Sequence, residues 1–168
     1  MRIAVTGPES TGKTTLAMAL AKALEGVFIP EFAREYLLQL DKPYTQDDLD
    51  VIAKGQLKLW NASSEKPVVV SDTEMLVMHV WSEVSYQNTS SFILKSLGSQ
   101  TFDHYFLCAP DIPWEEDPLR EHPEMREELF EIYLEKLEEL GFPFSIISGD
   151  EEHRLKSALE VLKGKGLI

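Results

Sequence analysis

The sequence predicts a three-layer α/β fold, with a five-stranded parallel sheet that helices cover on both faces. Short apolar stretches alternate with stretches of helical spacing five times along the 168 residues, an order typical of parallel sheets with crossover helices. The first apolar stretch, residues 2–6, leads through a glycine-rich turn into a helix at residues 15–24. No linker, repeat or low-complexity segment divides the chain, so residues 1–168 are expected to form a single domain.

The glycine-rich turn fits G-x-x-x-x-G-K-[ST], the phosphate-binding P-loop. Gly7 and Gly12 allow backbone angles and a close approach that a side chain would block. The backbone amides and the positive end of the following helix attract phosphate, Lys13 is expected to reach the β- and γ-phosphates of ATP, and the Thr14 hydroxyl is expected to bind Mg²⁺. The expected ATP-binding residues are Gly7, Glu9, Ser10, Thr11, Gly12, Lys13, Thr14 and Thr15.

The first part of the chain after this motif predicts a strand, two helices and a second buried strand. A short apolar run at residues 27–29 predicts a strand that leads to Glu31. Helical spacing follows at residues 32–40, and a further helix begins at Thr45, where Asp48 completes a variant of the capping box. Residues 41–44 between these two helices predict a turn.

Residues 67–72 contain an unbroken run of valines at 68–70 and predict a strand covered on both faces, as in parallel sheets. It ends in an acid, Asp72, and an acid at the end of a strand beside the P-loop strand holds the Mg²⁺ shell or the attacking group in P-loop folds. Helices are predicted at residues 74–84 and 90–97, the second closed by Gly98.

The last third of the chain predicts two more strands, at residues 103–108 and 143–148. Between them lies a loop at residues 109–122 that holds three prolines and five acids. Such a long polar loop is usually either functional or disordered, and in a P-loop kinase a lid is expected at this place. The helix after it is predicted at residues 123–140, with a proline in its first turn, and a closing helix at residues 151–163.

The composition excludes several classes of function. Lys plus Arg number 16 against 29 for Asp plus Glu, a formal net charge of −13, whereas a nucleic-acid-binding surface needs basic patches. No apolar run is long enough for a membrane span. The chain starts on a strand without a signal peptide, so we expect a cytoplasmic protein. Its one cysteine, Cys108, is expected to be a buried thiol. The oligomeric state, including a homo-oligomer, is left open.

The P-loop, Glu31, Asp72 and the loop at residues 109–122 all follow strands, so we expect them to meet at one edge of the sheet. Two acids are candidates to accept a substrate proton, Glu31 and Asp72, each ending a strand beside the P-loop. The sequence does not decide between them. Asp72 is also a candidate Mg²⁺ ligand, and its alternative role is a cap for the helix at residues 74–84.

Five stretches carry a resemblance to a known family: residues 7–15, 30–36, 71–73, 80–83 and 110–121. Together they resemble the ribosylnicotinamide kinase domain of the bacterial NAD-biosynthesis protein NadR, and the resemblance covers nearly the whole chain. It implies ATP-dependent phosphorylation of the ribose 5′-hydroxyl of nicotinamide riboside, to give nicotinamide mononucleotide.

The chain departs from that family in two respects. NadR proteins carry an adenylyltransferase domain ahead of the kinase, so we expect neither adenylyl transfer nor gene repression from this chain. Glu74 stands where the family commonly has Asp. The chain is also similar in layout to deoxynucleoside kinases, in which an acid at the position of Glu31 accepts the proton.

The positively charged ring of nicotinamide riboside suits an aromatic face with acids nearby. The candidates are Tyr36, Trp81 and Trp114. Trp114 is favoured because it lies in a polar loop, whereas Trp81 has helical spacing and fits the core equally well.

Two arginines are candidates for the phosphates. Arg34 is expected to reach a phosphate or the ribose, or to be an ordinary surface residue. Arg120 is expected to stabilise the transferring phosphoryl group, as arginine fingers do, or to pair with Asp117 or Glu121. Arg126 is not expected to reach this region.

Two other functions remain open from the sequence: a kinase of another nucleoside or nucleotide, and a regulatory module that hydrolyses ATP slowly. A lid over a small substrate favours a kinase. The preference for ATP over GTP and feedback by NAD are not decided by the sequence.

Overall fold

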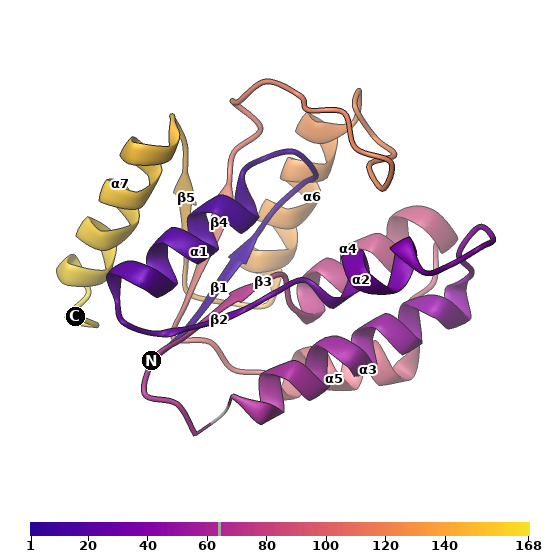
Figure 1. Cartoon of the computed structure of the whole chain (residues 1–168), viewed down its shortest axis with the longest axis horizontal. Coiled ribbons are helices and arrows are strands. Elements are labelled where there is room, and N and C mark those ends of the chain that lie inside the picture. The colour runs from indigo at the N-terminus through magenta and orange to yellow at the C-terminus, as the bar shows by residue number, and fades with distance from the viewer. Residues whose placement is uncertain (64) are drawn as a thin grey trace.

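Five parallel strands form the centre of the molecule, in the order β2-β3-β1-β4-β5 (Figure 1). The structure is a computed structural model that describes residues 1–63 and 65–168. The expected α/β fold with a five-stranded parallel sheet is confirmed. The strands are β1 Arg2–Thr6, β2 Val27–Ile29, β3 Val69–Asp72, β4 His104–Cys108 and β5 Phe144–Ile147.

Helices cover both faces of this sheet, because alternate residues of each strand point to opposite sides. Ile3 and Val5 pack in a core with α1 and α7, whereas Ala4 packs in a second core with residues of α2 to α6. Figure 1 shows α1 and α7 on one side and the other helices on the opposite side. The helices are α1 Lys13–Ala23, α2 Phe32–Leu38, α3 Gln46–Ala62, α4 Met75–Tyr86, α5 Ser91–Ser99, α6 Arg126–Glu139 and α7 Glu151–Gly164.

The strand order separates the two candidate acids. Asp72 ends β3, which pairs directly with β1 and sets Val5 opposite Asp72. Glu31 follows β2, which is the edge strand beyond β3. Both candidate acids therefore follow strands at the same edge of the sheet: Asp72 ends the strand that pairs with β1, and Glu31 follows the strand beyond it.

Several helix ends differ from the expectation by a few residues, and two of them concern a proline or a glycine. Helix α6 begins at Arg126, not at Pro123, because residues 122–125 form a turn closed by a bond from the Met125 amide to the His122 carbonyl. Gly98 does not close α5, which continues to Ser99. The capping box of Thr45 and Asp48 is confirmed.

None of the helices among the described residues is both long and apolar enough to cross a membrane.

Candidate functional site

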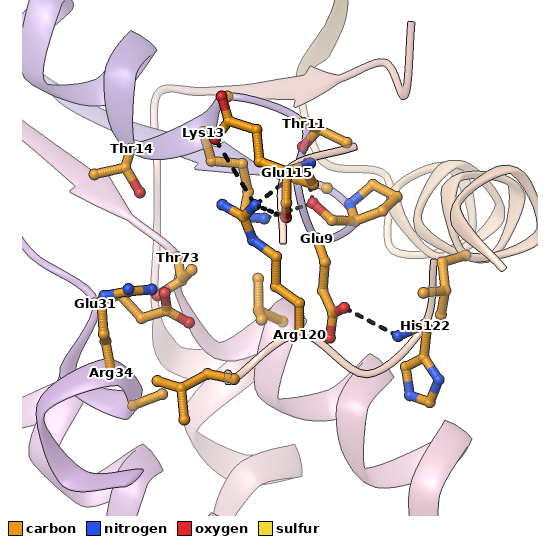
Figure 2. Close-up of a pocket in the computed structure, with 18 of the residues that line it drawn as sticks. Glu9, Thr11, Lys13, Thr14, Glu31, Arg34, Thr73, Glu115, Arg120 and His122 are labelled. Atoms are coloured by element: carbon orange, nitrogen blue, oxygen red, sulfur yellow. Dashed lines mark hydrogen bonds and ion pairs between the residues drawn. The ribbon is translucent and has the colours of Figure 1, made fainter. Parts of the chain in front are cut away.

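A cavity of about 780 Å³ lies where the P-loop, Glu31 and the loop at residues 109–122 meet at the carboxyl edge of the sheet (Figure 2). We call this loop the lid, after the role that we expect for it. At one end its wall is the P-loop with Arg120 of the lid. At the other end it is an apolar chamber between α2, α4 and α6. The chamber is lined by Ala33, Leu37, Leu40, Tyr44, Val77, Val80, Trp81, Val84, Leu129 and Tyr133.

The P-loop has the backbone that its glycines allow. Gly7 has φ 129° and lies so close to β4 that a Cβ atom would be 2.9 Å from the carbonyl oxygen of Cys108. Gly12 adopts the left-handed conformation, φ 73°, immediately before α1 begins at Lys13. The Lys13 ammonium donates a hydrogen bond to the Pro8 carbonyl at 2.6 Å. The Lys13 side chain therefore folds back over the P-loop, where the phosphates of ATP are expected to bind.

Thr14 and Asp72 lie together beside the P-loop. The Thr14 hydroxyl donates to one Asp72 carboxylate oxygen at 2.6 Å. The other oxygen, Oδ1, is buried and has no hydrogen-bond partner among the described residues. Mg²⁺ prefers oxygen ligands such as these, so this donor set fits a magnesium ion.

Asp72 does not cap the helix that follows it. Glu74 is the cap of α4, and its carboxylate accepts from the Leu76 amide. Glu74 is fully buried, which raises the pKa of its carboxyl to about 7. The alternative role of Asp72 as a helix cap is therefore wrong. Its carboxylate instead accepts the hydrogen bond from the Thr14 hydroxyl.

Glu31 and Arg34 belong to the start of α2 and line the same cavity (Figure 2). Burial raises the pKa of Glu31; Lys13 opposes this shift and Asp72 adds to it. Burial also raises the pKa of Asp72, against the hydrogen bond from Thr14. Both acids are thus better proton acceptors than an ordinary carboxylate.

The lid is fastened to two side chains of the P-loop. The Glu9 carboxylate accepts from the amides of Glu121 and His122, at 2.9 and 3.2 Å. The Ser10 hydroxyl accepts from the Glu115 amide at 2.9 Å and from the Arg120 guanidinium at 3.2 Å. Glu9 and Ser10 occupy positions that the motif leaves free, so their contacts with the lid have no sequence signal.

Arginines complete the attachment of the lid. Arg120 pairs with Glu115 at 3.8 Å, whereas Asp117 pairs with Arg34 at 2.6 Å and Glu121 accepts from the Tyr44 hydroxyl. Both alternatives predicted for the pairing of Arg120 are therefore wrong.

Arg126 reaches the P-loop, which the sequence did not lead us to expect. It donates to the carbonyls of Ser10 at 3.0 Å and of Ile112 at 2.9 Å. The buried Arg154 of α7 similarly joins the carbonyl of Thr11, at 2.8 Å, to Asp111 of the lid. Both arginines bind the loop through its backbone, so no motif marks them.

A chain of hydrogen bonds joins three residues that line the cavity, Trp81, Tyr44 and Glu121. The Trp81 indole donates to the Tyr44 hydroxyl at 3.0 Å, and Tyr44 donates to the Glu121 carboxylate at 2.8 Å. The two rings meet edge to face with centroids 5.1 Å apart. Tyr44 lies in a segment predicted only as a turn, so the sequence gave no sign that it lines the cavity.

The other two aromatic candidates lie elsewhere. Two guanidinium groups lie over the Trp114 ring, that of Arg120 at 5.9 Å and that of Arg126 at 5.8 Å from its centroid. The Tyr36 hydroxyl donates to Asp48 of α3 at 2.6 Å. Among the described residues that line the cavity, Trp81 is the one candidate of the three.

The comparisons with known proteins agree with this fold. The family described as AAA domain matches residues 2–154. No curated protein matches the sequence. The solved structure of the NadR protein in complex with NR has a TM-score of 0.83 and 24% sequence identity; the match covers 96% of this chain and 51% of NadR. The chain therefore spans about half the length of that protein.

Two shorter proteins share the fold over their whole length. Deoxyadenosine kinase from M. mycoides, with dCMP and dCDP bound, has a TM-score of 0.71 and 16% identity over 98% of this chain and 100% of its own. Thymidylate kinase from Ehrlichia chaffeensis has a TM-score of 0.70 and 15% identity over 96% of this chain and 98% of its own. The molecule thus has the P-loop fold of nucleoside and nucleotide kinases.

Proposed function

We propose that this chain, which belongs to the AAA domain family, is an ATP-dependent kinase that phosphorylates the 5′-hydroxyl of nicotinamide riboside to give nicotinamide mononucleotide. The observation that supports this function most is one continuous cavity that joins the P-loop, Glu31 and the apolar chamber. The similarity to the NadR protein solved with NR supports the choice of substrate. The reaction would be a step of NAD biosynthesis.

Phosphoryl transfer depends on positioning and on neutralising charge. The P-loop amides and Lys13 hold the β- and γ-phosphates of ATP. Glu31 accepts the proton of the 5′-hydroxyl while the hydroxyl oxygen attacks the γ-phosphorus. The bond between the γ-phosphorus and the β,γ-bridging oxygen breaks, and that oxygen leaves with ADP. The raised pKa of Glu31 suits this role. Arg34 and Arg120 line the same space and balance the charge on the transferring group.

Thr14 and Asp72 are the residues that would hold Mg²⁺. The ion would neutralise charge on the β- and γ-phosphate oxygens. The unpartnered, buried oxygen of Asp72 supports this assignment over a purely structural one.

The apolar chamber fits a nucleoside with a cationic ring. Trp81 and Tyr44 offer aromatic surfaces, and the Glu121 carboxylate lies 2.8 Å from the Tyr44 hydroxyl. A pyridinium ring is stabilised by aromatic faces and by nearby negative charge. Trp81 is therefore the stacking residue that we favour, ahead of Trp114 and Tyr36.

The experiment that tests this function is a coupled assay of ADP release with Mg-ATP and a panel of nucleosides. We expect nicotinamide riboside to stimulate release, and uridine, thymidine and deoxyadenosine to stimulate it less. Equal or faster turnover of another nucleoside would keep the kinase and discard the named substrate. Because the chain is similar in fold to deoxyadenosine kinase, deoxyadenosine is the alternative substrate to test first.

A slow rate of ATP hydrolysis that no nucleoside changes would instead favour a regulatory ATP-binding module. The many contacts that hold the lid over the P-loop are an argument against that alternative.

A further inference from the structure

Gln56 of α3 binds the backbone on both sides of Glu31. Its side-chain oxygen accepts from the Phe32 amide at 2.8 Å, and its side-chain nitrogen donates to the Pro30 carbonyl at 3.2 Å. Gln56 is 2% exposed and is not among the described residues that line the cavity. Its polar atoms are therefore committed to this backbone, and it is not placed to contact a substrate.

The two groups that Gln56 binds belong to the two peptide planes that flank Glu31. A peptide unit is planar, so the orientations of these two planes define φ and ψ of the residue between them. They hold Glu31 at φ −68° and ψ 113°. With the backbone angles fixed, the direction of the Cα–Cβ bond is fixed, and the side chain points into the cavity (Figure 2).

The contact also leaves the Glu31 carboxylate free. Glu31 is the residue before the first turn of α2, where an acid commonly bonds to amides of its own helix. It makes no such bond. The first amide of the helix, that of Phe32, is instead satisfied by Gln56, as the unpaired amides at a helix start require.

Gly55 makes this approach of α3 to α2 feasible. A Cβ atom at residue 55 would lie 2.2 Å from the Phe32 ring, far inside van der Waals contact. The absence of a side chain at residue 55 therefore lets Gln56 come within reach of Phe32 and Pro30.

We propose that Gln56 is a positioning residue: it fixes the peptide groups on either side of Glu31 and so aims the Glu31 carboxylate at the hydroxyl that is phosphorylated. This inference rests on the proposed function, in which Glu31 accepts the hydroxyl proton. Gln56 itself exchanges no proton.

The test is a double-mutant cycle with Gln56→Met and Glu31→Gln. Gln56→Met keeps the length of the side chain and removes both hydrogen bonds. We expect it to lower kcat about 10- to 100-fold, the cost of misplacing a reacting group by a fraction of an ångström, with the KM for ATP unchanged. In the Glu31→Gln background it should change kcat less than about twofold, because no proton acceptor is left to aim. An equal loss in both backgrounds would overturn the proposal.

Two further variants separate positioning from stability. Gln56→Glu keeps an acceptor for the Phe32 amide and should recover part of the lost kcat. Gln39→Met makes the same substitution at an exposed site at the end of α2 and should leave kcat unchanged. Melting temperatures of all variants show whether a loss of folded protein contributes.

A crystal structure of Gln56→Met tests the proposal without any activity. We expect the Glu31 carboxylate to leave the cavity and to bond to amides of its own helix. A Glu31 side chain that stays in place would overturn the role of Gln56. Full activity of Glu31→Gln would overturn the role of Glu31 as proton acceptor instead, so the two failures are distinguishable.

Discussion

The two ends of the cavity recognise their ligands by different means. The phosphate end is built from backbone, and its glycines at residues 7 and 12 adopt angles or approaches that other residues rarely allow. The chamber is built from side chains of α2, α4 and α6. Backbone recognition constrains residue types at fixed spacing, whereas many combinations of side chains make a similar chamber. The P-loop motif therefore indicates phosphate binding from its spacing alone, whereas no spacing of residues indicates the second substrate, which the sequence suggests only through a family resemblance.

The largest effect is expected at the phosphate end. Lys13→Ala should lower the rate of phosphorylation at least about 10³-fold, because a positioned charge on the transferring phosphate is lost. The fold should persist, since Lys13 is only part-buried and its hydrogen bond is to the Pro8 carbonyl. ADP release and a melting curve measure both, with Lys22→Ala on the same helix as control. A variant that keeps more than about one per cent of wild-type activity would contradict the assignment of this end of the cavity to phosphate binding.

The next effect lies at the junction of the two ends. Glu31→Gln should lower kcat about 10²-fold or more, the usual contribution of a general base. In the wild type the base must be unprotonated, and burial raises the pKa of Glu31 above 4.5. The kcat should therefore be lost as pH falls, with a midpoint above 4.5. A kcat of Glu31→Gln close to that of the wild type, together with a strong effect of Asp72→Asn, would move the proton acceptor to Asp72.

A smaller and more selective effect is expected in the chamber. Trp81→Ala should raise the KM for the nucleoside about tenfold, the size of a buried cation–π contact, and leave the KM for ATP nearly unchanged. Trp114→Ala should raise both KM values together, because Trp114 packs on Arg120 and Arg126 above the P-loop. A loss confined to the nucleoside in Trp114→Ala would assign the stacking role to Trp114 instead.

The smallest effect concerns Glu74, a fully buried residue that follows the cavity residue Thr73 in the sequence. Its pKa is about 7 in the folded protein and 4.5 without the fold, so the folded state binds more protons between these values. Its contribution to stability is full below 4.5 and is lost as pH rises through about 7. We expect the free energy of unfolding to fall by about 1 kcal/mol between pH 6 and 8 from this group, and Glu74→Gln to remove that slope. Denaturant unfolding measures it; parallel curves for the two proteins would exclude the role of Glu74.

The sequence predicts the local features and misses those that depend on distant residues. The P-loop, the five strands and the placement of Asp72 follow from patterns within a few residues. The chain of contacts from Trp81 through Tyr44 to Glu121 joins three segments far apart in the sequence. No periodicity or spacing encodes such a contact, because it depends on how the helices pack.

The lid illustrates the same limit. Its position after β4 was expected from its length and composition, and the structure has it over the P-loop. Its partners were not expected, since the lid binds Glu9 and Ser10 at positions where the motif accepts any residue. The edge position of β2 was also missed, because strand order depends on pairings that the order of elements along the chain does not fix.

The central position of β1 has a consequence for how the protein is made. This strand is synthesised before both of its neighbours, since it pairs with residues 69–72 of β3 and with residues 104–107 of β4. Such pairings across long stretches of chain form slowly. Gly7 of the P-loop also lies against the Cys108 carbonyl at the end of β4. We therefore expect the P-loop to take its folded shape on the ribosome only after β4 has emerged, so that ATP could stabilise the nascent chain only from that point.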